Sequence, residues 1–64
     1  MKVSKTGDGE LLIYKSDGNG GFINIIVDDE GCIELMHIPD DRTKTTNKIG
    51  ASVDETIEFW NKYD

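Results

Sequence analysis

The sequence predicts an α+β fold, in which an antiparallel β-meander of three or four strands is packed on one face by a single C-terminal amphipathic helix. Two observations predict the sheet: short apolar runs rich in β-branched residues, and glycine-containing turns between them. A third predicts the helix, since the last stretch of the chain spaces its apolar side chains with helical periodicity. The 64 residues suffice for a single small domain, residues 1–64.

The best-marked element is a hairpin over residues 22–38. Two apolar runs flank an acidic turn, residues 28–31, whose last residue is a glycine that is free to take positive φ. Ahead of the hairpin, the sequence predicts an edge strand within residues 1–5, a turn at 6–9, a strand at 10–15 and a flexible loop at 16–21.

Alternation along the hairpin distinguishes its two faces. One face carries Asn24 and Glu34 and is expected to be partly wet, as in an antiparallel sheet covered on one side only. The other face has the cleaner apolar set, which we expect to form the core: Ile23, Ile25, Val27, Ile33 and Leu35.

The segment 39–51 is predicted to be a long polar loop between the last strand and the helix. Pro39 ends the strand because it has no N–H to donate, and Ile49 is the one clear apolar anchor in a Thr- and Lys-rich stretch. A short extra strand at residues 43–46 is an alternative for part of it. Loops of this length in small domains usually have a function.

The C-terminal helix begins with a capping box, Ser52-Val53-Asp54-Glu55. The serine hydroxyl is expected to accept from the backbone N–H three residues on, and the glutamate to reach back. On a helical wheel Val53, Ile57 and Trp60 form one stripe, flanked by Thr56, Phe59 and Tyr63, and we expect this face to dock on the sheet. The acidic residues and Lys62 lie opposite.

The formal net charge is −6, and it is unevenly distributed. No Lys or Arg lies between Lys15 and Arg42, whereas seven acidic residues do. This argues against direct nucleic-acid binding, which needs a basic face, and favours a basic protein partner or mimicry of a phosphate backbone. The alternative is a surface that only keeps the domain soluble. The candidate partner-binding residues are Asp28, Asp29, Glu30, Glu34, Asp40 and Asp41.

The sequence predicts no enzyme, no metal site and no cofactor. Cys32, the one cysteine, is expected to be a small buried hydrophobe in a reducing compartment. His37 lies five residues further along the same strand, so the two side chains are expected on opposite faces and form a poor dyad. The acidic turns lack the spacing of a calcium loop, and one Cys and one His are too few for zinc.

The chain is expected to be cytoplasmic. No apolar run approaches the roughly 18 residues of a membrane span. Residues 1–5 lack the apolar region of a secretory signal.

Two pieces of the chain, within residues 10–64, resemble the HicB-like antitoxin domain. The first is Gly20-Gly21-Phe22 with Asp28 in the turn and Gly31-Cys32; the second is the start of the helix, residues 50–58. Val27 and Glu30 stand where that family has turn prolines, and the DNA-binding domain of many members does not follow, which argues against operator binding. The resemblance implies neutralisation of a small basic ribonuclease toxin by covering its active surface.

The sequence therefore favours a small acidic, non-enzymatic protein-binding module that inhibits or neutralises a basic or nucleic-acid-binding partner, as an antitoxin does. One alternative is a phage or mobile-element inhibitor of a host enzyme that mimics DNA charge. Another is a structural, oligomerising domain that forms a homodimer through the spare sheet face. The residues of that face are Phe22, Ile26, Cys32, Met36 and Ile38. The binding site is placed either there or at the acidic turn.

Overall fold

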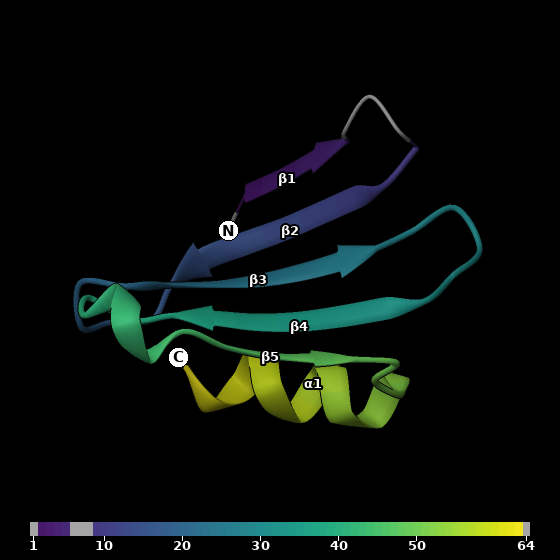
Figure 1. The fold of residues 1–64 in the computed structure, drawn as a ribbon. Helices are drawn as coiled ribbons and strands as arrows, with labels where there is room; N and C mark the ends of the chain where they lie inside the picture. The colour runs from purple at the N-terminus through teal and green to yellow at the C-terminus, as the bar shows by residue number, and fades with distance from the viewer. Residues whose placement is uncertain (1, 6–8, 64) are drawn as a thin grey trace.

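The computed structural model of the chain describes residues 2–5 and 9–63. They form one antiparallel sheet, in which each strand pairs with the next one in sequence, followed by one α-helix (Figure 1). The predicted α+β class, a meander with a C-terminal helix, is confirmed. The elements are β1 (Lys2–Lys5), β2 (Leu11–Ser16), β3 (Phe22–Val27), β4 (Ile33–Ile38), the 3-10 helix η1 (Arg42–Lys44), β5 (Thr46–Ile49) and α1 (Val53–Lys62).

The fifth strand lies inside the segment 39–51, which is therefore not the long loop that was predicted. The chain reverses at η1, where the Asp41 carboxylate accepts from the backbone N–H of Thr43 at 3.1 Å and from its hydroxyl at 2.6 Å. β5 then pairs with β4, from His37 opposite Thr46 to Glu34 opposite Ile49. The extra strand considered at residues 43–46 thus exists, but it begins three residues later.

The predicted hairpin of β3 and β4 forms, with Phe22 opposite Ile38 and Val27 opposite Ile33, and β4 begins one residue later than the predicted apolar run. Asp28 organises its turn, because its Oδ1 accepts from the backbone N–H of Glu30 at 3.0 Å and of Cys32 at 2.8 Å. An aspartate that bonds the backbone just ahead of it is a common turn-forming device.

The core lies on the face that alternation predicted. Ile23 is fully buried, and Ile25 and Leu35 are each 5% exposed. Partly buried hydrophobic residues from β2, from the hairpin and from the helix complete this layer: Ile13, Val27, Ile33, Phe59 and Trp60.

The helix docks with a different edge from the one predicted. Trp60 packs against the core as expected, but Val53 is 65% exposed and Ile57 is 53% exposed, while Phe59 takes their place. The helix has thus turned by roughly 75° from the stripe drawn at 100° per residue. Two polar contacts lie on the side of the helix that faces the sheet: Glu55 forms an ion pair with Lys48 on β5, and Tyr63 contacts His37 on β4. α1 accordingly lies alongside β5 (Figure 1).

This rotation predicts opposite outcomes for two alanine substitutions in α1. Phe59→Ala removes a half-buried ring from the core and is expected to lower the free energy of unfolding by about 2 kcal/mol. Val53→Ala removes exposed surface and is expected to change it by less than about 0.5 kcal/mol. Urea unfolding followed by circular dichroism measures both. If Val53→Ala lowered the free energy of unfolding more than Phe59→Ala did, Val53 rather than Phe59 would be the residue that packs on the sheet.

Candidate functional site

The loop between β2 and β3 is built around a buried carboxylate. Asp17 is 7% exposed, and its Oδ1 accepts from the backbone N–H of Asn19 at 2.7 Å and of Gly21 at 2.9 Å. Gly18 and Gly20 both have positive φ, which lets the backbone wrap around this side chain. The predicted flexible loop at 16–21 therefore has a defined centre.

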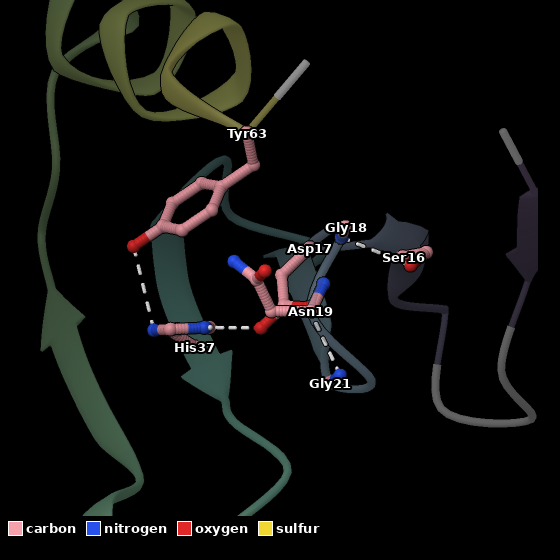
Figure 2. A network of polar contacts seen from close by, with 7 residues as sticks. All are labelled: Ser16, Asp17, Gly18, Asn19, Gly21, His37 and Tyr63. Atoms are coloured by element: carbon pink, nitrogen blue, oxygen red, sulfur yellow. Dashed lines mark hydrogen bonds and ion pairs between the residues drawn. The ribbon is translucent and has the colours of Figure 1, made fainter.

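The second oxygen of this carboxylate meets the one histidine of the chain (Figure 2). Asp17 Oδ2 lies 2.8 Å from His37 Nε2, and His37 Nδ1 lies 3.4 Å from the Tyr63 hydroxyl. An ionised carboxylate only accepts, so Nε2 carries a proton, and in the neutral ring Nδ1 is left to accept from the tyrosine. The Asp17–His37–Tyr63 network thus joins a loop, a strand of the sheet and the end of α1.

These hydrogen bonds favour the charged form of Asp17. The bond with His37 contributes most to holding the pKa of Asp17 below its ordinary value of 3.8, and the backbone N–H groups of Asn19 and Gly21 lower it further. Burial of the carboxyl acts in the opposite direction. A buried carboxylate that accepts these hydrogen bonds is more stable in its charged form, and this stabilises the folded state.

Both ring nitrogens of His37 contact groups of the chain itself, the Asp17 carboxylate on one side and the Tyr63 hydroxyl on the other. The one thiol is distant along the strand: Cys32 precedes β4, whereas His37 lies near its end. Within residues 2–5 and 9–63, no three His, Cys, Asp or Glu residues come together as metal ligands.

Cys32 is exposed, and this corrects the prediction that it is buried. It lies in the turn ahead of β4 rather than inside the strand, because the five residues from 28 to 32 close the hairpin around the Asp28 carboxylate. Its backbone N–H is bound by Asp28, while the side chain is left at the surface.

The six candidate partner-binding residues divide between the two ends of the sheet. Asp40 and Asp41 lie at the η1 end, where hydrogen bonds from Thr43 lower the pKa of Asp41. The opposite end holds the acidic turn, Asp28, Asp29 and Glu30, together with Glu34 two residues into β4 (Figure 1). Of the six, Asp28 and Glu34 line one common hollow.

Turn and strand meet around a small hollow of about 80 Å³ on the sheet face that α1 leaves uncovered. The sequence placed a binding site either at the acidic turn or on the spare sheet face, and here the two are continuous. The hollow is lined by Glu10, Ile26, Asp28, Cys32, Glu34 and Ile49.

The uncovered face itself is largely apolar. Within β2 to β5 its side chains form three rows across the strands. Phe22 and Ile49 are the most open of its large hydrophobic residues, at 48% and 70% exposure. The rows are Ser16-Phe22-Ile38, Tyr14-Asn24-Met36-Asn47 and Leu12-Ile26-Glu34-Ile49.

Sequence reasoning missed the pairing of Asp17 with His37. Part of the signal was present, since an aspartate followed by Gly-Asn-Gly-Gly is typical of a side chain that caps its own loop. The contact with His37 could not be predicted from the sequence, because the loop has to fold back over the end of β4 to bring the carboxylate to the histidine ring.

Comparisons of this chain with protein-family models, with curated proteins and with solved structures found no match. In residues 2–5 and 9–63, no helix is long and apolar enough to cross a membrane.

The lowered pKa of Asp17 predicts a specific response to acid. Since the pKa is below the unfolded value of 3.8, the stabilisation is present above that value and is lost as the pH falls through the folded pKa. Asp17→Asn is therefore expected to be less stable than the wild type near neutral pH, and this difference in stability should become smaller below about pH 4. The midpoints of urea unfolding of both proteins, measured over a series of pH values, give this difference. Asp29→Asn, in the exposed turn, is the control, and a gap that stays constant for Asp17→Asn would contradict the assignment.

Gly21 predicts a second effect on the same network. A Cβ at this position would lie 2.6 Å from Asp17 Oδ2 and from Pro39 Cα, and nearer still to the Ile38 carbonyl oxygen. We expect Gly21→Ala to cost about 3 kcal/mol of unfolding free energy and to shift the His37 ring signals in NMR spectra. Gly18→Ala meets no atom within 4 Å, so only its positive φ should cost about 1 kcal/mol, with the ring signals unmoved. Equal effects of the two would refute the crowding argument.

Proposed function

We propose that the chain is a non-enzymatic protein-binding module that inhibits or neutralises a basic, or nucleic-acid-binding, partner protein. The supporting observation is the uncovered sheet face, which is largely apolar and is continuous at one end with the acidic turn. Apolar surface of this kind with a polar rim is typical of protein-interaction sites.

Charge favours a basic partner over another acidic protein. Asp28 lines the hollow on this face, Asp29 and Glu30 follow it in the exposed turn, and no Lys or Arg lies within β3 or β4. Such a distribution steers a positively charged protein toward the face and repels an anionic one. A nucleic-acid backbone carries the wrong sign for this surface.

Two biological versions fit this module. One is an antitoxin of the HicB-like kind, which covers the active surface of a small basic ribonuclease. The other is a phage or mobile-element inhibitor that occupies the nucleic-acid site of a host enzyme by presenting carboxylates in place of phosphates. Both require the same contact with a basic surface, so one experiment tests the shared property.

Capture from the lysate of the native host, followed by an activity assay, tests this proposal. We expect the wild-type chain to retain a basic protein and to lower the activity of that protein when the two are mixed. Asp29→Asn with Glu30→Gln should weaken the capture about tenfold, because two charges at the rim of the face are lost.

Asp54→Asn with Glu58→Gln makes the matched control, since it removes the same charge from the exposed side of α1. Retention of the partner should survive in this control. Capture of no basic protein, or full activity of the captured protein in the presence of the chain, would refute the proposed function.

A further inference from the structure

We propose that Glu34 and the apolar side chains around it receive an arginine side chain of the basic partner, so that this carboxylate sets the specificity of the uncovered sheet face. The inference rests on the proposed function, because it names the contact through which the partner is recognised.

Glu34 is the one charged side chain that β2 to β5 place on this face. The other positions in the three rows are apolar or uncharged, and the face spans about 20 by 20 Å for four strands of six residues or fewer. The polar residues within this area are Ser16, Asn24, Asn47 and Glu34, and of these Glu34 alone carries a charge. Glu10 and Asp28 line the hollow beside it, so the charge at this end of the face has one sign, which favours a cationic group.

The surroundings of Glu34 prepare it for a cation from outside the chain. Its residue pairs across the strands with Ile26 on one side and Ile49 on the other, and it is half-buried. Asn47 donates to its Oε2 at 3.0 Å, which fixes the carboxylate over the face. Among the described residues, no Lys or Arg forms an ion pair with it. The hollow beside it leaves room for an incoming group.

Arginine fits this position better than lysine. Its guanidinium is planar and weakly hydrated, so it can lie against the Ile26 and Ile49 side chains while donating to the carboxylate. A charge-assisted hydrogen bond made in such partly dehydrated surroundings is stronger than one at an open surface. The ammonium of lysine is strongly hydrated and loses more on entering an apolar surface.

A second copy of the chain suits the face poorly. Each copy carries a formal net charge of −6, so two copies repel one another at low ionic strength. Like charges brought together without compensating cations oppose association. The charge pattern therefore favours a basic partner over a second copy of the chain.

Two synthetic amphipathic helical peptides test the inference, with a shared leucine face and either arginine or glutamine on the polar face. NMR titration of the isotope-labelled chain follows its backbone amides. We expect the arginine peptide to shift the amides of β3, β4 and β5 around Glu34, and the glutamine peptide to shift none of them. Glu34→Gln should weaken the binding of the arginine peptide about tenfold.

Glu58→Gln is the matched control, because it makes the same change on the exposed side of α1 and should alter the affinity less than about twofold. Ile49→Thr and Val53→Thr form a second pair, one exposed residue on each side of the molecule, and only the first should weaken binding. Thermal unfolding of each variant verifies that the fold is retained.

Several outcomes would overturn the inference: binding of neither peptide, shifts confined to α1, equal losses for Glu34→Gln and Glu58→Gln, or a wild-type dimer that Ile49→Thr dissociates. The last would assign the face to a second copy. Each of these leaves the proposed function to its own test, since a basic partner can still be captured and inhibited through another surface. Absence of a basic partner in the capture experiment refutes the function and this inference together.

Discussion

The described residues include one α-helix, which covers one face of a sheet that has two, and this constraint shapes the rest of the structure. The helix side buries Ile23, Ile25 and Leu35 and supplies the core. The other side keeps its apolar rows without cover from any described segment. A domain of this size buries a smaller fraction of its surface than a larger one does, so its stability is marginal.

Polar contacts as well as apolar packing join the helix to the sheet. Its N-terminus is capped by Ser52, whose hydroxyl accepts from the Glu55 backbone at 3.1 Å, and Glu55 also pairs with Lys48 on β5. At the far end, the Asp17–His37–Tyr63 network ties the helix to β4 and to the β2–β3 loop. Lys15 adds a contact over the Trp60 ring, 4.2 Å from its centroid. These anchors leave Val53 and Ile57 in solvent.

The two sides of the sheet differ in what covers them. On the helix side, the Asp17–His37–Tyr63 network and the Lys48–Glu55 ion pair join α1 to the sheet. The opposite side offers surface that is already formed, since Asp28 shapes the turn through two backbone hydrogen bonds and Asn47 orients Glu34. Binding to preformed groups costs less conformational entropy than binding to mobile ones. Asp40 and Asp41 lie apart from this surface, near η1. Asp41 accepts a hydrogen bond from the Thr43 backbone and so caps that turn.

Local patterns in the sequence determined the strands of the hairpin, its inward face, the acidic turn and the capping box, because each depends on neighbours a few residues apart. Tertiary structure decided the rest. β5 forms because β4 offers a free edge to a weakly apolar segment, and the helix docks through Phe59 and Trp60, which pack against the core. Asp17 meets His37 across 20 residues of chain, a distance over which no local pattern operates.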